Sequence, residues 1–80
     1  MSYMFEVHYR PPADPARETT LAQRVARLGG RLDYREVPAD GLPGGVCLTF
    51  EFDDIERARA AAQALRAAGE YVEGPVDYGP

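Results

Sequence analysis

The chain has few of the residues from which catalytic and metal sites are usually built. It contains one cysteine, one histidine, no lysine and no tryptophan among 80 residues. One cysteine cannot form an internal disulfide bond. One cysteine and one histidine also fall short of the four such ligands of a typical structural zinc site. The composition therefore predicts no metal and no cofactor, and it makes covalent catalysis an unfavoured hypothesis.

Positive charge is also scarce. Nine arginines stand against thirteen acidic residues, and the formal net charge is −4. A general nucleic-acid-binding protein normally has a basic field, so we expect no nucleic acid as a partner. The exclusive use of arginine fits either the base composition of a GC-rich genome or a need for fork-like pairing with carboxylates.

Long apolar runs are absent. No stretch approaches the roughly 20 apolar residues that span a bilayer, and the opening MSYMFEVHYR alternates and is charged, unlike a signal peptide. We therefore expect a cytoplasmic protein without a membrane partner. The length predicts a single domain over residues 1–80. A chain this small buries only about 60–65% of its unfolded surface, so its stability margin is thin.

What is present is organised around residues 44–69, which read as a strand, a short turn and a helix. Apolar residues at 46, 48, 50 and 52 alternate with Cys47, Thr49 and Glu51, so the two sets lie on opposite faces of a strand. Asp53-Asp54-Ile55-Glu56 is a capping-box-like helix start, in which an acidic N-cap is followed three residues later by Glu56, and negative charge suits a helix N-terminus. The helix then has one apolar stripe and ends at a glycine: Ile55, Ala58, Ala62, Leu65 and Gly69.

The first half of the chain has a similar pattern. Residues 3–10 alternate as a strand that ends before Pro11-Pro12. Asp14 and Pro15 favour a helix start, and the helix is predicted over residues 15–28. Its apolar positions and its stop are Leu21, Val25, Leu28 and Gly29-Gly30.

The remaining segments are two strands and a loop. A weaker strand is predicted over residues 32–37, and residues 38–45 (PADGLPGG) form a mobile loop. The last strand covers residues 71–78 and is interrupted by Gly74-Pro75. A proline inside a strand is tolerated mainly at a sheet edge, so this strand is expected at an edge.

The order βαββαβ predicts an α+β fold of the ferredoxin-like type. The right-handed crossover rule favours an antiparallel sheet ordered 4-1-3-2, with both helices on one face. The residues expected to face the helices are Tyr3, Phe5, Val7, Tyr9, Val46, Leu48, Phe50 and Phe52.

The sheet face without helices is the candidate binding surface. Its central strands would present Met4, Glu6, His8, Arg10, Cys47, Thr49 and Glu51. Antiparallel pairing is expected to bring His8 towards Cys47 or Thr49, a combination that suggests a metal site or a nucleophile with its base. An ordinary polar face or a self-association surface is the favoured hypothesis. RNA-recognition domains of this topology place aromatic residues outward on these two strands, whereas here the aromatic residues point inward.

The chain also resembles the family of the regulator of ribonuclease E activity B. The resemblance includes Val7-His8-Tyr9 in the opening strand, a helix that ends before glycine, and an apolar strand with a cysteine. Ala68-Gly69-Glu70-Tyr71 is similar to the Gly-Gly-Glu-Tyr of that family. The chain departs from the family where Val72-Glu73-Gly74-Pro75 replaces Asp-Gly-Trp. The resemblance implies a small acidic regulator that binds another protein and uses no cofactor.

Two functions remain open. The first is a non-catalytic interaction or regulatory module that pairs with a protein partner or weakly with itself. The second is a small dimeric α+β-barrel-like enzyme with a site around His8. Histidine is the residue type that exchanges protons near neutral pH. In an enzyme His8 should occupy a recess with its ring bonded to Glu6 or Glu51, whereas in a module no pocket should surround it.

Overall fold

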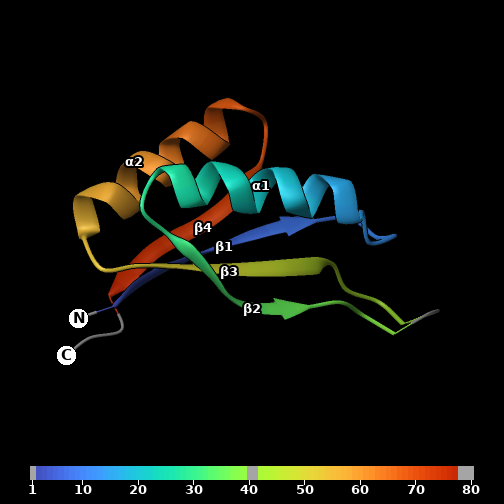
Figure 1. The fold of residues 1–80 in the computed structure, drawn as a ribbon. Coiled ribbons are helices and arrows are strands. Elements are labelled where there is room, and N and C mark those ends of the chain that lie inside the picture. Colours follow the sequence, from blue (N-terminus) through green and yellow to red (C-terminus); the bar gives the residue numbers. More distant parts are fainter. Residues whose placement is uncertain (1, 40–41, 78–80) are drawn as a thin grey trace.

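The order of elements agrees with the predicted ferredoxin-like fold. The structure, a computed structural model, describes residues 2–39 and 42–77. Its elements are β1 (Tyr3–Tyr9), α1 (Pro15–Arg27), β2 (Arg31–Glu36), β3 (Val46–Phe52), α2 (Ile55–Ala67) and β4 (Tyr71–Asp77). The strands form one antiparallel sheet in the order β2-β3-β1-β4, which is the predicted order counted from the other edge. Both helices lie on the same face of the sheet (Figure 1).

The core lies between the sheet and the helices, where the strand alternation placed it. The inward residues of β1 and β3 are buried, except Tyr3, which is partly buried and packs against the core. The ring of Phe5 stacks on Phe52 with centroids 5.5 Å apart and lies 5.9 Å from that of Phe50. Three aromatic rings in contact supply much of the apolar area that a chain of this size can bury.

The two helices begin and end in the same way. The carboxylates of Asp14 and Asp54 accept hydrogen bonds from backbone N–H groups of the first turn. Asp14 is the predicted N-cap of α1, whereas the N-cap of α2 lies one residue after Asp53, the residue that the capping-box spacing to Glu56 indicated. At the other end, Gly29 and Gly69 adopt φ angles of 94° and 95°. The N–H groups of Gly29 and Gly30 donate to the carbonyls of α1, and α2 ends in the same pattern. The halves of the chain are therefore similar units.

The helix faces differ from the prediction at three residues. Ala61 is fully buried beside Ala58, Ala62 and Leu65, although the predicted stripe omitted it. Ile55 is half-buried, because it is the first residue of α2 and lies at the margin of the core. Leu28 is 38% exposed, because α1 ends at Arg27 and Leu28 forms the C-cap.

Both edge strands are irregular. β2 begins one residue earlier than predicted and ends one residue earlier, and all six of its residues are exposed. Its register against β3 shifts between Leu32 and Tyr34. In β4 the predicted interruption at Gly74-Pro75 coincides with a register shift against β1. Gly74 has a φ of 104°, and an added Cβ would lie 3.1 Å from the carbonyl oxygen of Met4.

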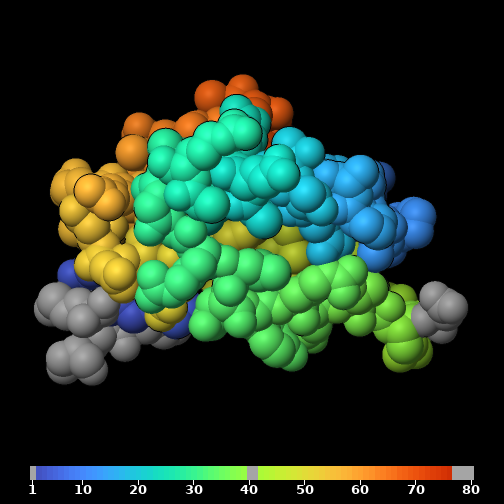
Figure 2. Space-filling model, in the orientation of Figure 1, coloured from blue at the N-terminus to red at the C-terminus, as the bar shows by residue number. Residues whose placement is uncertain are grey.

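The sheet presents one face that no element of the described residues covers. In Figure 2 the helices lie above the sheet, and β2 forms the near edge below α1. We call this surface the helix-free face. From the pairing register it consists of Met4, Glu6, His8, Arg31, Tyr34, Glu36, Cys47, Thr49, Glu51, Tyr71, Glu73 and Val76.

Some predictions concern residues outside the described ranges. The predicted mobility of loop 38–45 falls partly on Asp40 and Gly41, and the predicted last strand included Tyr78. Among the described helices, none has both the length and the apolar composition needed to cross a membrane.

Candidate functional site

The strand register brings predicted site residues together at the centre of the sheet. His8 of β1 pairs with Cys47 of β3 on one side and with Tyr71 of β4 on the other. Glu6 pairs with Thr49 and Glu73. Positions two residues apart on one strand point to the same side, so His8 and Glu6 lie side by side on the helix-free face. The predicted approach of His8 to Cys47 is confirmed.

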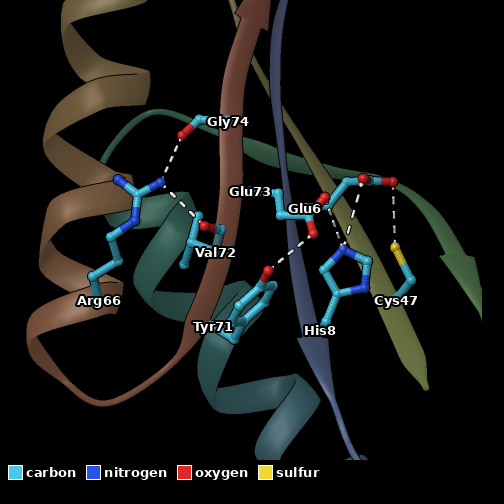
Figure 3. Close-up of polar contacts among 8 residues, drawn as sticks. All are labelled: Glu6, His8, Cys47, Arg66, Tyr71, Val72, Glu73 and Gly74. Carbon is cyan, nitrogen blue, oxygen red and sulfur yellow. Dashed lines mark hydrogen bonds and ion pairs between the residues drawn. The ribbon is translucent and has the colours of Figure 1, made fainter.

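Polar contacts link four residues at and beside the His8 imidazole (Figure 3). His8 Nε2 lies 3.7 Å from a carboxylate oxygen of Glu6 and 3.8 Å from one of Glu73. The Cys47 thiol donates a hydrogen bond of 3.4 Å to the other oxygen of Glu6. We call Glu6, His8, Cys47 and Glu73 the His8 cluster. Its members come from three neighbouring strands, so the antiparallel register holds their backbones in place.

The state of the thiol limits its chemistry. Burial raises the pKa of the Cys47 thiol to about 11, and the hydrogen bond to Glu6 and the negative charge of that carboxylate act in the same direction. A thiol with this pKa is almost wholly protonated near neutral pH, and the thiolate is the nucleophilic form. The Cys47 thiol is therefore poorly suited to nucleophilic catalysis.

Strand β4 contributes residues that the sequence analysis missed. Glu73 approaches His8, and the Tyr71 hydroxyl donates to Glu73 over 3.2 Å. The Tyr71 ring lies edge-on to the imidazole, with centroids 5.9 Å apart. The alternation of Tyr71, Val72 and Glu73 was the signal available. It was overlooked because only the two central strands were considered.

Helix α2 fixes the position of this part of β4. The Arg66 guanidinium donates to the carbonyl oxygens of Val72 (3.1 Å) and Gly74 (2.7 Å). These two carbonyls flank Glu73. The arginine therefore links the helix layer to the segment that presents Tyr71 and Glu73 on the opposite face.

An open hollow of about 450 Å³ adjoins the cluster. It is lined by His8, Tyr9, Arg10, Pro11, Gly44, Gly45, Tyr71 and Glu73. An interaction module was expected to have no pocket around His8, whereas this hollow lies beside it. Within the described residues, His8 Nε2 nevertheless makes no hydrogen bond to a carboxylate, because both of its distances to carboxylate oxygens exceed hydrogen-bonding range. The structure thus meets part of the expectation for each function.

The other predicted residues are not members of the cluster, although Thr49 and Arg10 lie next to it. Arg10 follows the end of β1 at the rim of the hollow. Thr49 lies opposite Glu6, and Met4 lies opposite Glu51 further along the sheet. Glu6 or Glu51 was the predicted carboxylate neighbour of His8, and the structure places Glu6 there. Glu51 lies four residue pairs from His8 along the strand register, where it accepts hydrogen bonds from Arg31 (3.0 Å) and from the hydroxyl of Ser2.

The aromatic residues of the helix-free face lie on its edges. β1 and β3 direct their aromatic residues inward, as predicted, but β2 and β4 expose Tyr34 and Tyr71. The two tyrosines are separated by the width of the two central strands. They are accompanied on the same two strands by the acidic residues Glu36 and Glu73.

Comparisons with known proteins supply no family for this chain. No protein-family model matches it, and no curated protein matches it. The argument about function therefore rests on the geometry of the helix-free face.

Proposed function

We propose that the chain is a non-catalytic protein-interaction module that binds through its helix-free face, with a second copy of the chain as a weakly held partner. The supporting observation is that three large apolar side chains are exposed on this face. Tyr34, Tyr71 and Val76 are 59%, 62% and 51% exposed. Exposed aromatic and apolar side chains on one surface, with polar residues between them, are typical of sites where proteins associate.

The size of the face indicates weak association with a second copy. Four strands of about seven residues cover roughly 23 Å by 19 Å, or about 440 Å² of projected area. A stable complex buries about 800 Å² on each partner, so a face-to-face pair would fall at the transient end of the range. Association of this kind is expected at high protein concentration.

The same proposal includes a regulatory role. The resemblance to the regulator of ribonuclease E activity B favours a ribonuclease as a further protein partner, with inhibition of RNA cleavage as the readout. A cytoplasmic location is part of the proposal, and a single free thiol fits a reducing compartment. We expect neither a membrane nor nucleic acid as a direct partner.

Sedimentation velocity at micromolar and millimolar concentrations tests the association. We expect a monomer at the lower concentration and a partly dimeric species at the higher one. Tyr34→Arg should abolish the dimer, since it places charge on an exposed apolar site of the interface. Leu28→Arg is the matched control, because Leu28 is exposed at the end of α1 on the helix side. A monomer at both concentrations would remove the self-association.

A second candidate is a dimeric α+β-barrel-like enzyme with its site at His8. The hollow beside His8 and the two nearby carboxylates favour it, because a proton-transferring imidazole needs a recess and a charged neighbour. Titration of the imidazole by NMR distinguishes the two. Coupling of its titration to Glu6 or Glu73, in a dimer that encloses the hollow, would put the enzyme first.

A further inference from the structure

We propose that Glu6, His8, Cys47 and Glu73 bind one zinc ion at the centre of the helix-free face. Neither proposed function requires a metal, so this inference goes beyond both. It starts from the arrangement of three different donor types. One imidazole nitrogen, one sulfur and one carboxylate oxygen, from His8, Cys47 and Glu6, lie within 4.8 Å of one another. The second carboxylate, that of Glu73, approaches Nε2 of the same imidazole from β4 (Figure 3).

Three separations in the cluster are close to the ligand–ligand distances of a tetrahedral zinc site. Ligands bound at about 2.0–2.3 Å around a tetrahedral ion lie roughly 3.3–3.7 Å apart. The contacts are 3.4 Å from Cys47 Sγ to Oε2 of Glu6, 3.7 Å from His8 Nε2 to Oε1 of Glu6, and 3.8 Å from His8 Nε2 to Glu73. Because Cys47 and His8 face different oxygens of Glu6, side-chain rotations are needed to bring the four ligands around one ion.

The imidazole nitrogen gives an independent reason to expect a cation. His8 Nε2 is inaccessible to solvent and makes no hydrogen bond within the described residues. Two carboxylates flank it at distances too long for hydrogen bonds and about twice a metal–nitrogen bond length. A buried polar atom without a partner is costly. An ion between the nitrogen and the two carboxylates would bind all three.

The donor set selects the metal. Thiolate and imidazole favour zinc and similar transition-metal ions, whereas magnesium and calcium prefer sites made of oxygen alone. Carboxylates complete the set and neutralise the dipositive ion. One cysteine and one histidine alone are too few ligands for a zinc site. The two glutamates that complete the set lie far apart in the sequence, on β1 and β4.

Zinc binding requires the thiol to lose its proton. Before zinc binds, the two carboxylates give the cluster a charge of about −2, with the imidazole and the thiol counted as neutral. Formation of the zinc–sulfur bond releases one proton to solvent and displaces the waters of the ion, which leaves a net charge of about −1. No electron is transferred. The raised pKa of Cys47 makes affinity depend on pH, with tighter binding as pH rises.

The test is titration of the reduced, tag-free protein with zinc chloride, followed by calorimetry in two buffers of different ionisation enthalpy. We expect one ion per chain and about one proton released per ion. Cobalt(II) chloride is the spectroscopic probe. It should give a thiolate-to-metal charge-transfer band and the visible bands of a tetrahedral ion.

Single variants assign the ligands. Cys47→Ser should abolish the charge-transfer band, and His8→Gln, Glu6→Gln and Glu73→Gln should each weaken binding by at least ~10-fold. Glu51→Gln is the matched control on the same face and should retain the wild-type affinity, since Glu51 pairs with Arg31. Thermal unfolding of each variant in the presence of a chelator checks that the variant is folded without metal. If one variant is unfolded, the zinc affinities of the remaining variants test the ligand assignment.

Two results would overturn the proposal. One is failure of zinc to bind or to raise the melting temperature of the wild-type protein. The other is binding that survives all four ligand variants, which would mark a nonspecific acidic surface. Both outcomes are separable from the interaction proposal, because metal binding is measured at concentrations where the chain is a monomer.

Discussion

Phe50 is the residue on which the core depends most. It is fully buried at the centre of β3 and contacts the ring of Phe5. Phe50→Ala should lower the free energy of unfolding by ~3–5 kcal/mol, because it removes a buried ring and leaves a cavity. Denaturant unfolding measures the change. Phe50→Leu, which retains much of the volume, should cost clearly less, and a loss below ~1 kcal/mol for the alanine variant would contradict the assigned strand phase.

Cys47 should react slowly although it is partly exposed. Burial and the Glu6 carboxylate raise its pKa from 9.0 to about 11. Below both values, a rise of this size leaves ~100-fold less thiolate than an ordinary thiol has at the same pH. Alkylation by iodoacetamide near pH 8, followed by mass spectrometry, should therefore be slow when the protein is folded.

Glu6→Gln provides the comparison for this reaction. It removes the charge that accepts the thiol hydrogen bond, so alkylation should become faster. The urea-unfolded protein gives the reference rate of the free thiol. A folded wild-type rate equal to this reference would contradict the raised pKa.

At the scale of elements, Asp54 fixes the start of α2. Its carboxylate accepts hydrogen bonds from the backbone N–H groups of Glu56 (2.8 Å) and Arg57 (3.4 Å). Asp54→Ala should lower stability by about 1 kcal/mol, because these N–H groups lose their partner at the helix terminus. Thermal unfolding monitored by circular dichroism measures the loss. Asp53→Ala, one residue earlier, makes no cap and should cost less; equal losses would contradict the capping role.

The elements were predictable where one physical rule dominates. β1 and β3 are central strands with one buried face, so the alternation of apolar residues determined their faces and limited the neighbour of His8 to Cys47 or Thr49; the register in the structure selects Cys47. Asp14 marked the start of α1, and the pair Asp53-Asp54 marked the start of α2 to within one residue. Ala61 was missed because alanine is common on buried and on exposed helix faces alike.

The edge strands were harder to predict. All six residues of β2 are exposed, so its apolar pattern contains little information about its register. The shift at Gly74-Pro75 changes the phase of β4 and places Val76 on the helix-free face beside Met4. The candidate site was therefore predictable only in part: three of the four residues of the His8 cluster follow from the central strands, and Glu73 does not.

At the scale of the whole molecule, charged contacts fasten the helix layer to the sheet. Glu18 of α1 accepts hydrogen bonds from the Tyr9 hydroxyl of β1 and from the Arg35 guanidinium of β2. The hydrogen bond from Arg35 lowers the pKa of Glu18, and that from Tyr9 acts in the same direction although burial opposes both. The contact between Glu18 and Arg35 links α1 to the exposed edge strand β2. Because it lowers the pKa of Glu18, it makes the stability of the fold depend on pH.

The sign of this dependence follows from the direction of the pKa shift. The ordinary pKa of the glutamate is 4.5, and the folded protein holds it lower. The stabilisation is therefore complete above about pH 4.5 and is lost as pH falls through the folded value, because the unfolded chain takes up the proton first. In Glu18→Gln this part of the acid sensitivity should disappear. The free energy of unfolding should then fall less steeply below pH 5 than in the wild type, as urea unfolding at several pH values measures.

Arg35→Gln supplies the matching test. It removes the largest cause of the shift but keeps the Glu18 carboxylate, so its stability should also depend less on pH in this range. The double variant should behave like Glu18→Gln alone, because the two side chains act as one pair. Parallel pH profiles for the wild type and Glu18→Gln would contradict the linkage. That result would mean that α1 is held to the sheet by the packing of its two buried residues, Leu21 and Val25.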